Sequence, residues 1–482
     1  MEDPQITDTS KAELDRLFEK QKAAFLADNN PSYEQRMEWL QAMEKMMVDL
    51  RQPIRDALGR DFDSHPELIT DLFETGGVLG RCRNAMVHLQ EWMAPEERPL
   101  LDVVHGSSRC EVVKQPKGVM GNIAPWNFPI ECSLVMVVDM LAAGNRVIVK
   151  MSELAPVTAD LIRQSVGRYF PEDVLAVVIG DVEFSEYFSQ LRWDHLTYTG
   201  NTNVGRLVMQ AAAKNLTPVT LELGGKNPTI FLEDGVDEQL IKEYLSFKFC
   251  KNGQICTSPD YALVPEGSLD TWLELAGKVW KEAYPTYIGH PDVTGIINER
   301  HYDRIINSLE EARNKGVQVV NLSDEEPDRE RRQIPMYLVV NPSDDLEVMR
   351  EETFGPVTPV RTYSTLDQAY AYINSRERPL ASYLVTMARE PEMVEQFKRR
   401  IVSGGAGINV FGFQAAEPTA PFGGIGSSGT GCHGGPQGFD NYSHSKTVYN
   451  CSQDNPLKMS VCAPYGEITQ AFADGIFAVP EQ

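Results

Sequence analysis

The sequence predicts an α/β protein built around two parallel sheets, and three features support this fold class. Strand-like apolar runs alternate with helical segments from Arg146 onward, a second alternating series starts at Pro228, and Gly224–Gly225 separates the two. Strands that alternate with helices are typical of parallel sheets, in which ligands bind beyond the carboxyl ends of the strands. At 482 residues, the chain is long enough for two or three domains.

The N-terminal segment of about 60 residues is predicted to be helical. Apolar side chains recur there at spacings of three and four, and Pro53 predicts a break or kink: Met37, Leu40, Met43, Met47, Leu50 and Ile54. From Leu100 to Gly118 the pattern becomes extended and predicts a β-hairpin around Gly106. The apolar run from Cys132 to Gly144 contains Asp139 and is too short for a membrane span, so it predicts a buried helix.

Two series of strands and helices follow. The first has predicted strands at 146–150, 175–180, 195–200 and 218–225, with helices at 155–170, 182–191 and 203–215. The second has strands at 228–233, 261–266, 357–363 and 381–386, with a helix at 237–251. We expect a domain boundary near Gly224–Gly225, where the glycine pair separates the series.

The composition argues against several classes of function. The formal net charge of -24 disfavours binding of nucleic acid or an anionic membrane, because such surfaces are basic. The opening residues are acidic and polar, so we expect no signal peptide, and we expect no membrane anchor. The eight cysteines form no CxxC pair and no disulfide-type spacing, which predicts reduced thiols in a cytoplasmic protein and no metal site.

Three glycine-containing stretches resemble phosphate-binding loops. The patterns at 424–429 and 429–434 fit G-x-G-x-x-G, but neither follows a buried strand or opens a helix, so they are interpreted as one glycine-rich loop. The stretch 199–205 is better placed, because Gly200 ends a predicted strand and Asn201 or Thr202 can cap the next helix. It is either a phosphate site or a plain βα turn.

Polar residues at strand ends and in stiff turns each have a functional and a structural interpretation. Lys150 and Glu153 follow the strand at 146–150, where they could bind a ribose or be surface charges. Asn127 lies between Pro125 and Pro129, which would hold its amide rigidly as a donor to an oxyanion; otherwise it is a turn asparagine.

Glu222 and Cys256 are the candidate reacting groups. Glu222 lies in an apolar strand before two glycines, where burial would raise its pKa and suit a general base. Cys256 lies in "KNGQICTSPD", and the local sequence alone leaves a nucleophile and a structural cysteine both open. Glu352 and Phe354 precede a Gly-Pro turn in "EETFGP".

Together, these motifs make the chain similar to the NAD(P)-dependent aldehyde dehydrogenase superfamily over nearly its whole length. The resemblance rests, in order, on "PWNFP", "KMSE", "TGNTNVG", "LELGGK", "GQIC" and "EETFGP". The closing stretch 421–448 resembles the branch of coniferyl, fatty and class 3 aldehyde dehydrogenases. "NLTPVTLELGGKNP" and "GQICTSPDYALVPE" look closest to the bacterial coniferyl aldehyde dehydrogenases.

The resemblance implies oxidation of a small-molecule aldehyde to the carboxylic acid with NAD(P)+. It implies that Cys256 is the nucleophile and forms a thiohemiacetal, then a thioester. Asn127 and the Cys256 backbone N–H would form the oxyanion hole, and Glu222 would activate the water that hydrolyses the thioester. The branch suggests aromatic, coniferyl-type aldehydes or medium- to long-chain aliphatic ones.

The resemblance also implies a set of cofactor contacts. Lys150 and Glu153 would bind the adenosine ribose, the pyrophosphate would lie along 200–205, and other residues would contact the rest of the cofactor: Gly200, Asn201, Gly205, Leu223, Glu352, Phe354 and Trp126, with Glu352 on the nicotinamide ribose. Met151, Asn201 and Ser258 depart from the usual Pro, Ser and Ala, which leaves the choice between NAD and NADP open. Glu153 favours NAD, because a carboxylate repels a 2′-phosphate.

By the same resemblance, the fold should be aldehyde dehydrogenase-like, with two Rossmann-like α/β domains and a small β element. We expect a dinucleotide-binding domain at 1–95 and 118–223 and a catalytic domain at 224–430. Residues 96–117 and 431–482 should form a bridging element and C-terminal tail. In the family this element pairs across a subunit interface, so we expect a homodimer or a dimer of dimers.

Three alternatives stay open. A CoA-acylating aldehyde dehydrogenase would resolve the thioester with a thiol, but such enzymes usually lack the glutamate found here as Glu222. A binding or structural protein could retain the fold without activity. A cofactor-free thiol hydrolase would need a histidine near Cys256, and no motif proposes one.

Overall fold

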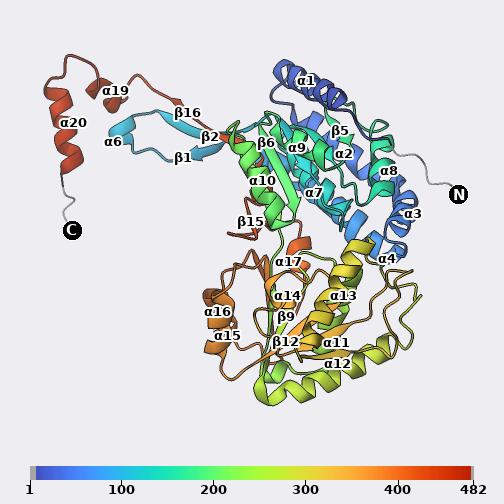
Figure 1. Cartoon of the computed structure of the whole chain (residues 1–482). Helices are drawn as coiled ribbons and strands as arrows, with labels where there is room; N and C mark the ends of the chain where they lie inside the picture. Colours follow the sequence, from blue (N-terminus) through green and yellow to red (C-terminus); the bar gives the residue numbers. More distant parts are fainter. Residues whose placement is uncertain (1–6, 479–482) are drawn as a thin grey trace.

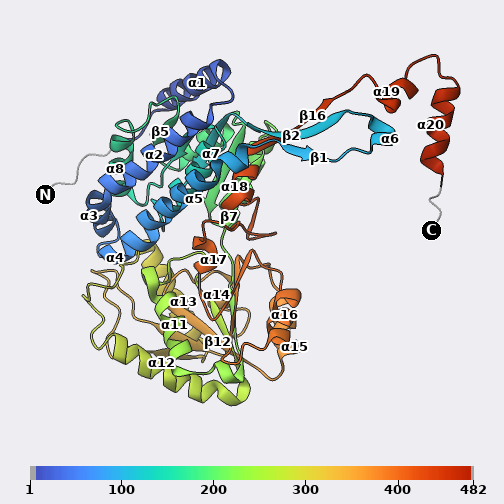
Figure 2. The ribbon, with the colours of Figure 1, turned by 180° about the vertical axis from the view of Figure 1, so that it is seen from behind.

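Two lobes and a projecting arm make up the molecule, and the computed structural model describes residues 7–478 (Figure 1; Figure 2). One lobe is built on a six-stranded sheet and the other on a seven-stranded sheet, while a three-stranded sheet forms the arm. The predicted α/β class is therefore confirmed.

The first lobe begins with helices and then alternates strands with helices. Its sheet has the order β15 (Gly429–Thr430), β7 (Val219–Leu223), β6 (His195–Gly200), β3 (Val119–Ile123), β4 (Arg146–Lys150) and β5 (Leu175–Val178). All neighbours are parallel except β15, which pairs antiparallel with β7. Around it lie α1 (Lys11–Ala27), α2 (Tyr33–Asp49), α3 (Arg51–Asp61), α4 (Glu67–Ile69), the π-helical turn η1 (Thr70–Thr75), α5 (Gly76–Met93), α7 (Glu131–Ala142), α8 (Pro156–Val166), α9 (Val182–Gln190), α10 (Thr202–Ala213) and α18 (Gly435–Asn441).

Helices cover both faces of this sheet, which explains why its strands are apolar throughout. On β4, Val147 and Val149 pack into the core formed with α2, α5, α7 and α8, while Ile148 packs into the opposite core with α1, α9 and α10. The alternation follows from the two-residue repeat of a strand. The predicted break near Pro53 lies at Leu50, and Pro53 itself falls in the first turn of α3, where proline is tolerated.

The second lobe has a mostly parallel sheet in the order β10 (Gln318–Asn321), β11 (Tyr337–Val340), β12 (Val357–Tyr363), β9 (Tyr261–Pro265), β8 (Pro228–Phe231), β13 (Ala381–Val385) and β14 (Gly405–Ile408). Two cores cover its faces. The other elements of this lobe are η2 (Glu233–Gly235), α11 (Glu238–Phe249), η3 (Cys250–Gly253), η4 (Glu266–Ser268), α12 (Leu269–Ala283), α13 (Glu299–Asn314), α14 (Glu347–Arg350), α15 (Leu366–Asn374), α16 (Pro391–Arg400) and α17 (Phe413–Ala416).

The arm extends away from both lobes in the two views (Figure 1; Figure 2). Its sheet pairs β1 (Glu96–Arg98), β2 (Arg109–Pro116) and β16 (Ser443–Asn450) in antiparallel fashion, with β2 in the centre. The arm also carries α6 (Asp102–His105), α19 (Pro456–Ser460) and α20 (Glu467–Phe477). The hairpin predicted around Gly106 is present, although α6 interrupts its extended backbone.

The strands and helices predicted in the two series are all present, with ends shifted by a few residues. The buried helix predicted within 132–144 is α7. Among residues 7–478, no helix combines the length and apolar character needed to cross a membrane. The domain ranges given above stay a prediction.

Candidate active site

The loop that carries Cys256 turns sharply directly after α11. Lys251, Asn252 and Gly253 have positive φ angles of 49°, 54° and 74°. A Cβ on Gly253 would lie 2.2 Å from the carbonyl oxygen of Gly355, so only glycine fits there. This close approach brings the Cys256 loop against the segment that contains Glu352 and Phe354.

Hydrogen bonds from the second lobe fix the backbone around Cys256. The Asn227 amide, just before β8, donates to the carbonyl oxygens of Cys256 at 2.7 Å and Ser258 at 2.9 Å. It also accepts from the Ala381 N–H at 2.9 Å. The Tyr383 hydroxyl on β13 donates to the Thr257 carbonyl oxygen at 2.5 Å. The Cys256 loop is therefore anchored to two adjacent strands, β8 and β13.

The Cys256 thiol sits in a desolvated and acidic environment. Burial raises its pKa, and the charges of Glu352, Glu131 and Glu222 raise it further, while a backbone hydrogen bond from Thr257 opposes them. At neutral pH the resting thiol is therefore protonated, and it could act as a nucleophile only if a base accepted its proton.

Glu222 is well suited to accept a proton. It lies on β7, is buried, and neither carboxylate oxygen has a hydrogen-bond partner within residues 7–478. Burial raises the pKa of this carboxyl well above its ordinary value. A buried carboxyl with no hydrogen-bond partner among residues 7–478, whose charge acts on the Cys256 thiol, has the electrostatics of a general base.

Asn127 is held against the Cys256 loop from the other lobe. Its Nδ2 donates to the Gln254 carbonyl oxygen at 3.0 Å, and its own carbonyl oxygen accepts from the Lys251 Nζ at 2.6 Å. A side-chain amide nitrogen has two N–H groups, so one stays available for a further acceptor. The Asn127 amide can therefore act as a donor next to Cys256.

Next to the end of β7 lie Glu352 and the paired rings of Phe354 and Trp126. The Glu352 carboxylate packs against Gly224, and its Oε1 lacks a hydrogen-bond partner in the described part of the chain. Burial and the nearby charge of Asp260 raise the pKa of Glu352 to about 8. The rings of Phe354 and Trp126 meet edge to face at 5.4 Å.

The remaining residues expected to bind a cofactor lie where parallel strands of the first lobe end. Lys150 ends β4 and donates to Glu153 at 2.6 Å, while Gly200 ends β6 and Asn201 caps α10 by accepting from the Asn203 N–H at 2.8 Å. Gly205 packs against Leu223 at the end of β7. The carboxyl ends of parallel strands meet at one edge of a sheet, which is where dinucleotides bind. An exposed cap at the start of α10 and the unpartnered oxygen of Glu352 fit such a ligand.

Several residues that contact this site lack a signal in the sequence. Glu131 and Cys132 start α7, and the Cys132 Sγ donates to Glu131 Oε2 at 3.2 Å. Glu74, on η1, accepts from the backbone N–H groups of Ile130 at 3.0 Å and Glu131 at 2.9 Å. The contacts of Glu74 join segments more than 50 positions apart in sequence, so no local spacing predicts them.

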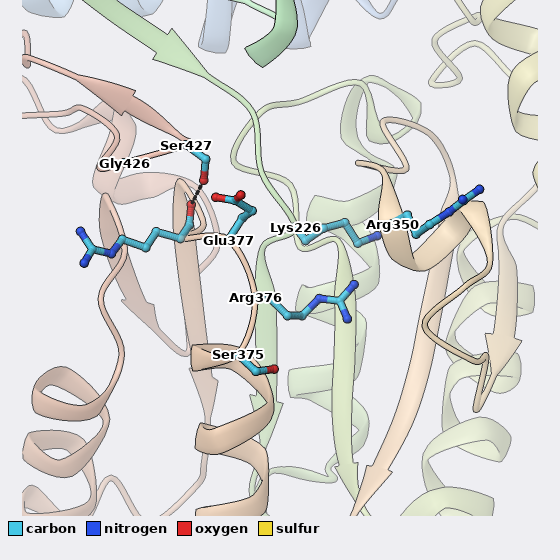
Figure 3. A pocket seen from close by; sticks show the side chains of 8 residues that line it. Lys226, Arg350, Ser375, Arg376, Glu377, Gly426 and Ser427 are labelled. Carbon is cyan, nitrogen blue, oxygen red and sulfur yellow. Dashed lines mark hydrogen bonds between the residues drawn. The ribbon is translucent and has the colours of Figure 1, made fainter. Parts of the chain in front are cut away.

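A separate cavity of about 680 Å³ lies beside the link between the two sheets (Figure 3). Its lining residues are Lys226, Arg350, Ser375, Arg376, Glu377, Arg378, Gly426 and Ser427. Lys226 is already paired with Asp260, and Arg376 donates to Asp344 at 3.0 Å. Cys256 is not among the lining residues, so this cavity is distinct from the thiol site.

Within residues 7–478, no group of three or more His, Cys, Asp or Glu side chains could hold a metal ion. All eight cysteines are free thiols.

The chain is similar to known proteins over most of its length. A sequence model described as "Aldehyde dehydrogenase family" matches residues 4–448. The chain is 37% identical over 475 residues to a probable coniferyl aldehyde dehydrogenase of Caulobacter vibrioides, covering 97% of this chain and 98% of that protein. A substrate-bound AldH of Staphylococcus aureus has a TM-score of 0.89 and 29% identity, covering 96% of this chain and 99% of its own. An aldehyde dehydrogenase of Mycobacterium tuberculosis complexed with NAD+ has a TM-score of 0.81 and 25% identity, covering 92% and 91%.

Proposed function

Because this chain belongs to the aldehyde dehydrogenase family, we propose that it oxidises its aldehyde at the thiol of Cys256, assisted by Asn127 and Glu222. The family makes it an NAD(P)-dependent oxidoreductase that forms a carboxylic acid. The observation that carries the assignment of residues is the setting of the Cys256 thiol. Burial and the charge of the buried Glu222 both raise the pKa of this thiol. The loop that carries it also accepts a hydrogen bond from the Asn127 side chain.

The first step is attack of the Cys256 sulfur on the carbonyl carbon of the aldehyde. The S–C bond forms, the carbonyl π electrons move to the oxygen, and the thiol proton passes to a base. Two observations support Glu222 as this base: its oxygens are unpartnered in the described chain, and its raised pKa makes its carboxylate form a stronger base. The free N–H of Asn127 and the Cys256 backbone N–H then donate to the oxyanion of the thiohemiacetal.

The cofactor site is formed by residues at the strand ends of the first lobe and by Glu352. Lys150 and Glu153 would bind the adenosine ribose, Gly200, Asn201 and Gly205 would border the pyrophosphate, and Leu223, Glu352, Phe354 and Trp126 would surround the nicotinamide end. When bound, the nicotinamide accepts hydride from the former carbonyl carbon. Glu222 must first release the thiol proton to solvent. As a carboxylate it then takes a proton from a water molecule, whose oxygen attacks the thioester carbon; the Cys256 sulfur leaves and the acid is released.

We expect a preference for NAD over NADP. Glu153 lies exposed at the end of β4, and its carboxylate would repel a 2′-phosphate. Lys150 pairs with Glu153 and could partly offset this repulsion of a 2′-phosphate. NADP is therefore the alternative cofactor. Initial rates with each cofactor test this preference.

The name of the Caulobacter relative supports an aromatic, coniferyl-type aldehyde as substrate, with medium- to long-chain aliphatic aldehydes as the alternative. A panel of coniferaldehyde, benzaldehyde and linear aldehydes, each with NAD and NADP, tests the substrate class. Cys256→Ala should abolish activity on every aldehyde. Cys250→Ala is the matched control, because this cysteine lies six positions upstream and is assigned no role.

The arm supports assembly into a homodimer or a dimer of dimers. Strands β1 and β16 are the open edges of its sheet, and unpaired edges favour pairing with another chain. Exposed apolar side chains lie on the same arm: Leu101, Val103, Met459, Val461, Tyr465, Ile468, Ile476 and Phe477. The free cysteines support a reducing compartment such as the cytoplasm.

A further inference from the structure

A fully buried ion pair joins the two lobes directly behind the Asn127 turn. The Lys251 ammonium pairs with the Glu74 carboxylate, and both side chains are 0% exposed. The Nζ of Lys251 also lies 4.0 Å from the centre of the Phe128 ring. Removing two charges from water is unfavourable, so such a pair needs additional hydrogen bonds to persist.

Those additional bonds all go to the segment 127–131. Lys251 donates to the Asn127 carbonyl oxygen at 2.6 Å. The second oxygen of Glu74 accepts from the backbone N–H groups of Ile130 at 3.0 Å and Glu131 at 2.9 Å. The pair therefore fixes the Asn127 turn at both ends, at its carbonyl and at the start of α7.

The same lysine belongs to the loop that carries the nucleophile. Lys251 lies five positions before Cys256, and its carbonyl oxygen accepts from Gln254 Nε2 at 2.9 Å. Gln254 in turn accepts from Asn127 Nδ2 at 3.0 Å. One closed set of contacts thus relates the amide of Asn127 to the backbone around Cys256.

We propose that Lys251 and Glu74 are positioning residues that hold the Asn127 amide at the distance from Cys256 required to stabilise the oxyanion. The proposal rests on the function assigned above. Neither residue touches the substrate, and their effect reaches the reaction only through Asn127. Displacing a hydrogen-bond donor by a fraction of an ångström weakens its stabilisation of a transition state steeply.

A double-mutant cycle on the first turnover tests this proposal. The variant Glu74→Gln/Lys251→Met removes both charges, so no unpaired buried charge remains. We expect the rate of the NADH burst to fall at least about 10-fold with this variant and about 100-fold with Asn127→Ala. In the Asn127→Ala background, Glu74→Gln/Lys251→Met should change the burst rate by less than about twofold, because the positioned group is already absent. Glu74→Asp keeps the charge pair but shortens the acceptor side chain, so it should give an intermediate loss, and it serves if the double variant does not fold.

Arg81→Met/Asp139→Asn is the matched control. This pair is also buried, at 4% and 0% exposure with a 2.8 Å contact, but it does not bond the segment 127–131. It should lower the melting temperature without changing the burst rate. Two outcomes would overturn the positioning role of Lys251 and Glu74 while leaving the assigned function intact. One is a burst rate in Glu74→Gln/Lys251→Met equal to that of wild type. The other is a loss of burst rate in the Asn127→Ala background as large as the loss in the wild-type background. An unchanged burst in Asn127→Ala would overturn the positioning role together with the oxyanion role of Asn127, while the Cys256→Ala result tests the assigned function separately.

Discussion

At the scale of single residues, the chemistry depends on where the thiol proton of Cys256 can go. Burial and three carboxyl groups raise the pKa of this thiol, so it does not rest as a thiolate at neutral pH. Glu222 is buried on β7 without a hydrogen-bond partner in the described chain, and burial also raises its pKa. A raised pKa makes the ionised Glu222 carboxylate a stronger base than an ordinary one, so proton transfer to it from the Cys256 thiol costs less free energy.

Replacing Glu222 with glutamine should separate the two halves of the reaction. We expect a burst of NADH close to one equivalent but slower than in wild type, because Glu222 no longer accepts the thiol proton. A steady rate about 100-fold or more below wild type should follow, because no base activates the hydrolytic water. Stopped-flow absorbance of NADH measures both phases. An unchanged steady rate would remove Glu222 from the base role.

Glu131 should make the stability of the protein depend on pH. Burial raises its pKa from 4.5 to about 7, so between these values the unfolded chain releases a proton that the folded chain retains. This contribution to the free energy of unfolding is complete below pH 4.5 and declines as the pH rises towards 7, by up to about 3 kcal/mol. Glu131→Gln should therefore flatten the stability profile in this window, as measured by urea unfolding. A profile with the same slope as wild type would contradict the shift.

The residues proposed for the site could be proposed from the sequence, but the residues that hold them in place could not. Each has a local signal in the sequence. Asn127 lies between two prolines, Glu222 lies in an apolar strand, and Cys256 follows a Gly-Gln pair. Lys251 and Glu74 pair across 177 positions, and their contact depends on how the two lobes meet. In the sequence each is one charged residue among many.

At the scale of elements, the residue before β8 anchors the loop that carries Cys256. Asn227 uses both of its amide N–H groups and its oxygen on three backbone groups, at Cys256, Ser258 and Ala381. Because it is fully buried, its loss leaves those groups unsatisfied.

Replacing Asn227 with alanine should destabilise the protein by about 2–4 kcal/mol and also slow the NADH burst. Urea unfolding and stopped-flow kinetics measure the two effects. Asn122→Ala is the control, because this asparagine is equally buried but donates to Ser133 on α7, at 2.8 Å. It should lower stability with little change in the burst rate. A comparable kinetic defect in both variants would contradict the anchoring role.

Most elements could be predicted because apolar strands and amphipathic helices have different periods. The exceptions have physical reasons. Strand β3 contains Gly121, which packs closely against the Trp193 ring and interrupts the apolar pattern. Strand β14, "GAGI", is half glycine, so its residues have little preference for extended structure. It forms a strand because it pairs in parallel with β13.

At the scale of the whole molecule, the arm has strand edges and apolar side chains that are left without partners within the described part of a single chain. It extends from the lobes, presents open strand edges, and exposes apolar residues on α20 that a monomer would leave in water (Figure 1). The sequence predicted this β element through its likeness to the family, while its composition alone indicates only a hairpin.

Charged substitutions on the arm should weaken the assembly. Phe477→Asp and Ile468→Asp replace apolar side chains that are 83% and 59% exposed, and a buried aspartate at a subunit interface is unfavourable. Sedimentation velocity over a range of concentrations should show wild type as a dimer or tetramer and the variants shifted towards monomer. Leu72→Asp, at a side chain 67% exposed on the first lobe, is the control and should sediment as wild type. A monomeric wild type would contradict the proposed assembly.

The central claim is that Cys256 alone carries the acyl group. Its most direct test is peptide mass spectrometry of Glu222→Gln after reaction with benzaldehyde and NAD+ and a rapid acid quench. We expect one benzoyl group per chain, on the peptide that contains Cys256. A benzoyl group on Cys132 or Cys250, or none on any cysteine while NADH still forms, would contradict the claim.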